Sequence, residues 1–228
     1  FSYSQIPSFT WEYTLPSNFS VQDYKSDTSG NVILVGNVSG TIDFDLGSGV
    51  SSWTTPNNPP CCPTEDAFIA KYNSSGMLLW RIIFSSTNNE SVQFLTLDNS
   101  GNIYIKATGV PISVDLDPGV GTYFLSNPGN FLAKYSPAGA LIWVDELDIY
   151  DAKMSIDPIT NDLLLAGHFY NTIDIDPSAS VNQLTGSDPA ADDSCCRVVG
   201  YRQSGGECPG HRSPVPDVPA AGARLPRS

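Results

Sequence analysis

Paired aspartates recur along the chain, and their spacing suits metal binding. Each pair has one residue between its members and precedes a Gly or Ser by two positions: Asp43 and Asp45, Asp115 and Asp117, Asp174 and Asp176. Residues two apart in a strand point to the same face, and Ca²⁺ prefers such carboxylate oxygens. Two acids make an incomplete ligand set, so the alternative is a turn in which the carboxylates accept backbone N–H bonds. The sequence predicts no cofactor other than this Ca²⁺.

No residue is assigned a catalytic role. Paired acids can act as general acid and base on a glycosidic bond, but an active site normally occurs once, whereas these pairs recur. The two histidines, His168 and His211, accompany no Gly-x-Ser-x-Gly nucleophile motif. No glycine-rich loop leads into a helix that could hold a phosphate. We therefore expect a protein that is not an enzyme.

Two pairs of adjacent cysteines stand in the stretches that follow the first and third aspartate pairs: Cys61 with Cys62, and Cys195 with Cys196. The Cys-x₂₋₄-Cys spacing of a zinc site is absent. Adjacent cysteines rarely bond to each other, so disulfides to distant partners are expected to staple these insertions. Free thiols are the alternative, and the pairing stays open.

Four tryptophans divide into two kinds. Trp11, Trp80 and Trp143 recur in phase with one another, which is typical of core residues in a repeated unit. Trp53 is out of phase and stands in the insertion after the first aspartate pair. We predict that Trp53 is a ligand contact on the surface.

The aspartate pairs belong to a long internal repeat. Asp27–Gly36 matches Asp98–Ala107 and Asp157–Gly167, and one aspartate pair follows each of these segments. After the pair, Asp66–Trp80 matches Asn130–Trp143. Gly- and Asn-containing turns separate short runs of alternating apolar residues, so each repeat predicts four short strands and one longer excursion. Four-stranded units in series are typical of the blades of a β-propeller, and a β-sandwich is the alternative.

We therefore predict an all-β protein, namely an incomplete β-propeller built from repeated four-stranded antiparallel blades. About three blades, the last incomplete, are expected in residues 1–196. Residues 197–228 are expected to be a disordered or frameshifted tail, because their basic residues are all arginines and no Leu-Leu-Trp follows. A closed propeller typically has four to eight blades, so we expect a fragment that self-associates through its open edges.

Composition restricts the partners. The chain has 228 residues with 24 acidic and 11 basic side chains, a formal net charge of −13. This excess of negative charge argues against binding of nucleic acid or of anionic lipid surfaces. No apolar run reaches 18 residues, so membrane insertion is not expected.

The motifs Asp-Ala-Phe-Ile-Ala-Lys-Tyr-x-x-x-Gly-x-Leu-Leu-Trp and Asp-x-Ser-Gly-Asn-Ile-Tyr resemble the bacterial SBBP-type β-propeller repeat, in its Asp-Phe-Asp-Pro-Gly variant. The resemblance implies a secreted or cell-surface protein with a non-enzymatic scaffold or adhesion role. Its ligand would be protein or carbohydrate, bound through the insertions after the aspartate pairs. The alternatives are a propeller-type hydrolase or lyase acting on glycans, and a fragment without independent function. The chain departs from the family pattern in its long insertions and its degraded third copy.

Overall fold

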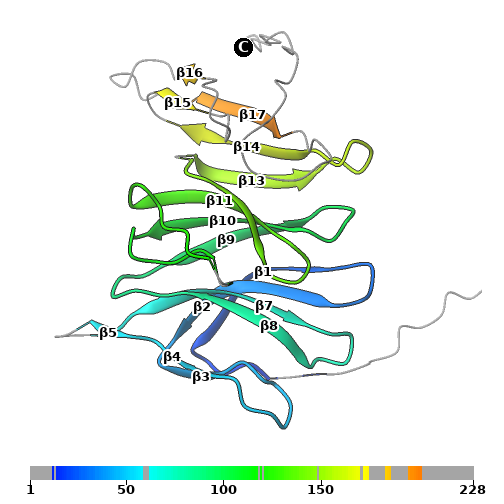
Figure 1. Ribbon diagram of the computed structural model, residues 1–228, viewed down its shortest axis with the longest axis vertical. Coiled ribbons are helices and arrows are strands. Elements are labelled where there is room, and N and C mark those ends of the chain that lie inside the picture. The colour runs from blue at the N-terminus through cyan, green and yellow to red at the C-terminus, as the bar shows by residue number, and fades with distance from the viewer. Residues whose placement is uncertain are drawn as a thin grey trace, which may run out of the picture.

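A computed structural model describes residues 12, 14–58, 62–117, 119, 121–147, 149–169, 172–174, 183–185 and 195–201. Within these ranges the chain forms no helix, and its longer strands assemble into antiparallel sheets (Figure 1). The prediction of an all-β, antiparallel fold is confirmed.

The first sheet contains four strands in the order β1 (Phe19–Ser26), β2 (Val32–Ser39), β7 (Glu65–Tyr72) and β8 (Leu78–Phe84). All neighbours are antiparallel. The hairpin between β1 and β2 is closed by a turn that begins at Asp27, because the Asp27 carboxylate accepts the backbone N–H groups two and four residues later.

The second sheet repeats this arrangement with β9 (Ser91–Leu97), β10 (Ile103–Val110), β11 (Gly129–Tyr135) and β12 (Leu141–Asp145). The register also repeats. Tyr135 lies opposite Ile103 at the start of β10, as Tyr72 lies opposite Val32 at the start of β2. The sequence repeat therefore corresponds to a structural repeat.

The third sheet contains β13 (Tyr150–Ile156), β14 (Leu163–Phe169) and β17 (Cys195–Tyr201). Tyr201 lies opposite Leu163, which is the same register as in the other two sheets. β17 runs across positions 196 and 197, where the sequence predicts a domain boundary. The remainder of the predicted tail, residues 202–228, lies outside the described residues.

Each sheet has an excursion between its second and third strands. In the first excursion β3 (Thr41–Asp43) pairs with β4 (Ser52–Thr54), and β5 (Asn57–Asn58) pairs with β6 (Cys62–Pro63). In the third, β15 (Thr172–Asp174) pairs with β16 (Gln183–Thr185). The hairpins β3–β4 and β15–β16 have the same register, so the first and third excursions begin with equivalent hairpins.

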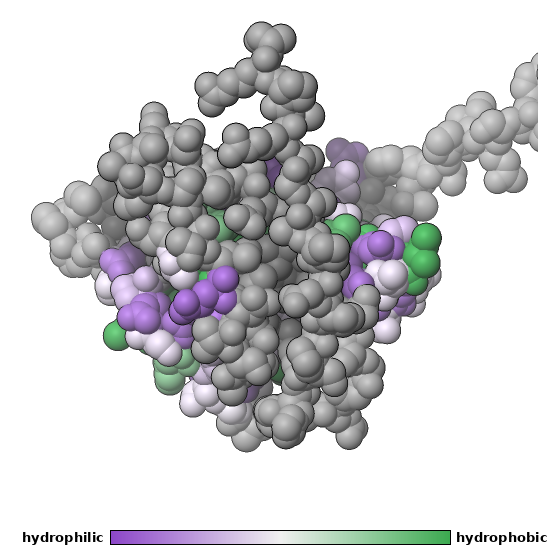
Figure 2. Space-filling model, turned by 90° about the horizontal axis from the view of Figure 1, so that it is seen from above, coloured by the Kyte–Doolittle hydropathy of each residue, from purple (hydrophilic) through white to green (hydrophobic). Residues whose placement is uncertain are grey.

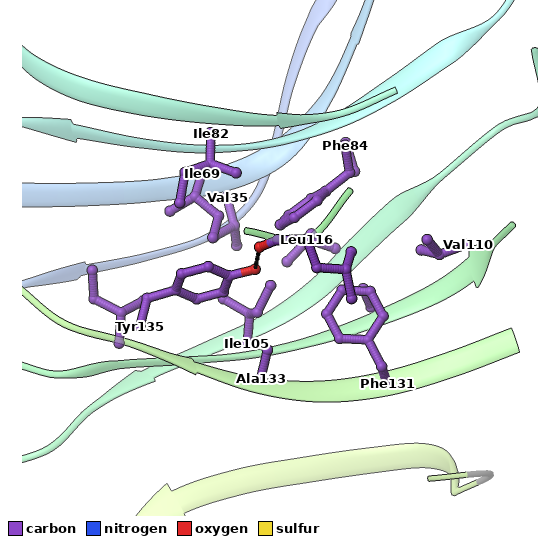
Figure 3. Packing of buried hydrophobic residues seen from close by; sticks show 14 of the residues in the cluster. Val35, Ile69, Ile82, Phe84, Ile105, Val110, Leu116, Phe131, Ala133 and Tyr135 are labelled. Atoms are coloured by element: carbon purple, nitrogen blue, oxygen red, sulfur yellow. Dashed lines mark hydrogen bonds between the residues drawn. The ribbon is translucent and has the colours of Figure 1, made fainter. Parts of the chain in front are cut away.

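The three sheets are stacked, with the second between the other two (Figure 1). One apolar core lies between the first and second sheets, where Val35 and Ile69 meet Ile105 and Phe131 (Figure 3). A second core, which includes Tyr104 from the other face of the second sheet, lies against the third sheet. The second sheet is thus buried on both faces, which is why its central strands are almost continuously apolar.

The first strands of the sheets lie next to one another along one side of the stack. The Leu95 N–H on β9 donates to Oδ2 of Asp23 on β1 at 3.1 Å. The Lys153 ammonium on β13 lies 4.1 Å from the centroid of the Phe94 ring on β9. These contacts connect β1, β9 and β13, which are edge strands of the three sheets.

Candidate functional site

The first aspartate of each described pair organises a turn at the base of its excursion. Asp43 Oδ1 accepts the N–H groups of Asp45 and Ser51 at 2.9 and 2.8 Å. Asp115 Oδ1 accepts those of Asp117 and Tyr123 at 3.0 and 2.8 Å. The two turns are equivalent, because each carboxylate binds the residues two and eight positions later.

The second aspartate of each pair packs against glycine. Asp45 Oδ1 accepts the Gly47 N–H at 2.8 Å, and a Cβ on Gly49 would lie 2.1 Å from Asp45 Oδ2. In the second excursion Asp117 holds the same relation to Gly119 and Gly121. The local pattern Asp-x-Asp-x-Gly-x-Gly is therefore explained by a compact turn.

The sequence analysis gave two roles for the aspartate pairs, Ca²⁺ binding and the formation of turns. The hydrogen bonds above show the turns. Among the described residues, no group of three or more Asp, Glu, His or Cys side chains is placed to hold a metal ion. Asp174 occupies β15 in the third hairpin, and Asp176 lies outside the described residues. Calcium binding at the aspartate pairs stays a prediction.

Buried tyrosines fasten each turn to its sheet. The Tyr72 hydroxyl donates to the carbonyl of Phe44 at 3.0 Å. The Tyr135 hydroxyl donates to the carbonyl of Leu116 at 2.8 Å (Figure 3). Both acceptors are the central residues of the aspartate pairs. Burial, followed by the charge of the nearby aspartates, raises the pKa of both phenols, so they remain donors at physiological pH.

Buried lysines connect the third strand to the hairpin turn of the same sheet. Lys71 Nζ lies 3.0 Å from Asp27 Oδ2, and Lys134 Nζ lies 3.3 Å from Asp98 Oδ2. Burial acts to raise the pKa of Asp27, but hydrogen bonds from Asn31 and Lys71 outweigh it and hold the pKa at about 2. The Ala-Lys-Tyr motif thus connects two other parts of its repeat. Its lysine binds the aspartate of the Asp-x-Ser-Gly turn, and its tyrosine binds the Asp-x-Asp turn.

The tryptophans that recur in phase pack at the cores. Trp80 is partly buried against the core between the first two sheets, and its indole N–H donates to the Pro137 carbonyl at 3.3 Å. Trp143 packs on the core between the second and third sheets, with its ring centroid 6.0 Å from that of Tyr104. Trp11 lies outside the described residues.

Trp53 also packs inward. Its ring is partly buried against the apolar cluster on the outer face of the first sheet, opposite Ile42 in the hairpin. Its N–H donates to Asp66 Oδ2 at 2.6 Å, and the Arg81 guanidinium lies 5.7 Å from the ring centroid. The equivalent position in the second excursion is the buried Leu125. A ligand contact at Trp53 stays a prediction, and the structure gives this residue a packing role.

Exposed apolar side chains on the excursions offer other contacts. Val50 is 80% exposed, Ile112 52% and Phe124 51%. They stand on loops whose bases the aspartate turns and the tyrosines hold in place. Figure 2, seen from the end of the stack near the third sheet, shows hydrophilic and hydrophobic described residues next to one another at both sides of the molecule.

Two acids that the sequence analysis did not single out lie in the interior. Asp66 on β7 and Glu90 just before β9 are both 0% exposed. Burial raises the pKa of Asp66, and burial followed by the charge of Asp66 raises that of Glu90 to about 7. A comparison of the repeats could have drawn attention to Asp66, because the second repeat has Gly129 at the same distance, six residues, before its motif tyrosine.

The structure describes three of the four cysteines that form the adjacent pairs. Cys62 belongs to β6, and Cys195 and Cys196 belong to β17, where Cys196 pairs with His168. Cys61 lies outside the described residues. The pairing of the sulfurs stays open.

No family model and no curated protein matches the chain. The resemblance to SBBP-type repeats rests on the motifs alone. Within the described ranges, the chain has no helix with the length and hydrophobicity needed to cross a bilayer.

Proposed function

We propose that the chain is part of an SBBP-type β-propeller, in which each stacked sheet is a blade. The protein is a secreted or cell-surface scaffold or adhesion module without catalytic activity. It binds protein or carbohydrate through the excursions that follow the aspartate pairs. The recurrence of one set of contacts in successive sheets carries this proposal, because repeated units with identical internal ties are typical of propeller blades.

Two features of the stack support blades over a β-sandwich. A sandwich has two layers, each with one buried face, whereas the second sheet here is buried on both faces. The first strands β1, β9 and β13 lie next to one another, as the innermost strands of propeller blades do around their central channel.

Binding through the excursions is supported by rigid anchoring combined with exposure. The Tyr72 and Tyr135 hydrogen bonds hold each excursion base, while Val50, Ile112 and Phe124 stay in solvent. Exposed apolar side chains on fixed loops are typical of contact sites.

The test is a binding screen of the purified chain on a glycan array and on a panel of extracellular proteins. The triple variant Val50→Ser, Ile112→Ser and Phe124→Ser should lose any ligand found. The matched control replaces Leu79, Ile142 and Ile159, which are exposed apolar residues outside the excursions. Equal loss in both triple variants, or retained binding in the first, contradicts the proposal.

A glycan hydrolase or lyase is the alternative function, and it needs acids that a substrate can reach. Asp66 and Glu90, two acids without counterparts in the other described sheets, are fully buried and out of reach of a substrate. The binding module therefore stays the first proposal.

Self-association is part of the proposal. Leu164 on β14 is equivalent in register to Ile33 and Tyr104, which are 0% and 1% exposed because the following sheet covers them. Leu164 itself is 37% exposed. A further blade, supplied by a second copy, would cover this face. Light scattering should show association that Leu164→Asp abolishes and Ile159→Asp preserves, and a monomeric parent chain would contradict this.

A further inference from the structure

Asp66 and Glu90 bring two carboxylates together at the junction between the first and second sheets. The segment 85–90, here called the link, connects β8 to β9. The Glu90 N–H donates to the Glu65 carbonyl at 3.1 Å, one residue before Asp66. Ser85 and Ser86, consecutive in the link, bind the Asp66 and Glu90 carboxylates respectively. These ties bring the two acids close enough for the charge of Asp66 to raise the pKa of Glu90.

Each carboxylate has one oxygen satisfied and one unsatisfied. Trp53 donates to Asp66 Oδ2 at 2.6 Å, and Ser86 donates to Glu90 Oε1. Asp66 Oδ1 and Glu90 Oε2 are buried and have no hydrogen-bond partner among the described residues. Two ionised carboxylates in this position would suffer both desolvation and mutual repulsion, and one bound proton removes most of that cost.

The surroundings determine which acid carries the proton. Asp66 receives hydrogen bonds from Trp53 and Ser85, which favour its ionised form. The Arg81 guanidinium, which lies over the Trp53 ring, donates instead to the Ser51 hydroxyl and the Ser52 carbonyl. The Glu65 side chain is exposed to solvent. Glu90 is therefore the protonated partner.

The pair is confined to the first repeat. The position equivalent to Glu90 is Phe19 at the start of the first sheet and Ile149 at the start of the third, and both are buried apolar residues. The position equivalent to Asp66 is Gly129 in the second sheet. Neither acid recurs at the equivalent positions of the other described sheets, so the combination of the two carboxylates occurs once in the described residues, at this junction.

We propose that Asp66 and Glu90 hold one proton between them and act as a pH-dependent latch that fastens the link to the first sheet. When Glu90 ionises, its proton passes to water and leaves two adjacent buried carboxylates. The desolvation of the new charge, followed by its repulsion by Asp66, favours opening of the link between the first and second sheets. This inference does not depend on the identity of any ligand.

The direction of the pH effect follows from proton linkage. The pKa of Glu90 rises from its ordinary 4.5 to about 7 in the folded state. The latch therefore contributes fully below pH 4.5 and is lost as the pH rises to about 7. Over this window the opening equilibrium increases about tenfold per pH unit, or roughly 300-fold in all.

Infrared spectroscopy and amide hydrogen exchange test the latch in the full chain. The infrared band of a protonated carboxyl should persist at pH 6 and titrate near 7, and it should be absent in Glu90→Gln. Exchange of the Glu65 and Glu90 amides, corrected for intrinsic rates, should accelerate with pH in the parent chain. In Glu90→Gln this acceleration should disappear, because glutamine remains neutral.

The matched control is Glu146→Gln, which alters a solvent-accessible acid that accepts the Ser126 and Asn127 N–H groups. It should keep the parent pH dependence. The proposal is overturned if the parent shows no carboxyl titrating near neutral pH, if Glu90→Gln keeps the pH-dependent exchange, or if the carboxyl titrates while exchange stays constant. The infrared titration needs no variant, so a poorly folding variant leaves the test intact.

Discussion

Removing one buried hydroxyl should show how firmly an excursion is held to its sheet. In Tyr135→Phe the donor to the Leu116 carbonyl is lost, and both residues are 0% exposed, so water cannot replace it. A net hydrogen bond is worth about 1 kcal/mol, and leaving a buried acceptor unsatisfied costs about 1–3 kcal/mol. We expect the free energy of unfolding to fall by about 2 kcal/mol.

The assay is urea unfolding followed by tryptophan fluorescence, with the midpoint compared at unchanged slope. Tyr72→Phe removes the equivalent bond to Phe44 in the first sheet and should cost a similar amount. Because the two bonds share no partner, the double variant should lose about 4 kcal/mol. Tyr24→Phe changes an exposed phenol and is the matched control. If Tyr135→Phe destabilises no more than Tyr24→Phe, the anchoring role is wrong.

Lys71→Met should lower the free energy of unfolding by about 2 kcal/mol, because the half-buried Asp27 would lose its cation. Lys25→Met at the exposed pair is its control. The low pKa of Asp27 places its contribution of about 2 kcal/mol above pH 3.8, and acid titration of stability should show it lost as the pH falls towards 2. Gly36→Ala should destabilise the hairpin in thermal melts, since its Cβ would lie 1.9 Å from the Ser20 carbonyl oxygen; an unchanged melting temperature would contradict the packing.

Several features follow from local chemistry and could be read from the sequence. The all-β class, the strands and the hairpin turns follow from alternating apolar residues and from Asp-x-Ser-Gly-Asn turns, whose bonds span only a few residues. The sequence repeat also predicted which segments of the first and second sheets occupy equivalent positions, and the strand registers agree with it. Residues 198–201 lie in the third sheet in the register that Ile69–Tyr72 have in the first.

The roles of individual site residues were harder to predict, because they depend on partners far away in the chain. Trp53 was predicted to contact ligand because it breaks the phase of the other tryptophans. In the structure its N–H donates to Asp66, 13 residues further on, which the sequence could not show, and the ligand contact stays a prediction. The aspartate pairs have the spacing of metal ligands, yet in the first two excursions backbone N–H groups occupy their Oδ1 atoms.

The sequence by itself determined the repeat and its elements, since turn formation and strand alternation are short-range properties. Only the tertiary structure decided that Lys71 meets Asp27, that Tyr135 reaches Leu116 and that Glu90 lies beside Asp66. These pairs are separated by 19 to 44 residues, and strand register and sheet stacking bring them together. Burial then changes their chemistry: the same carboxylate is a solvated charge on the surface and a proton-binding group inside.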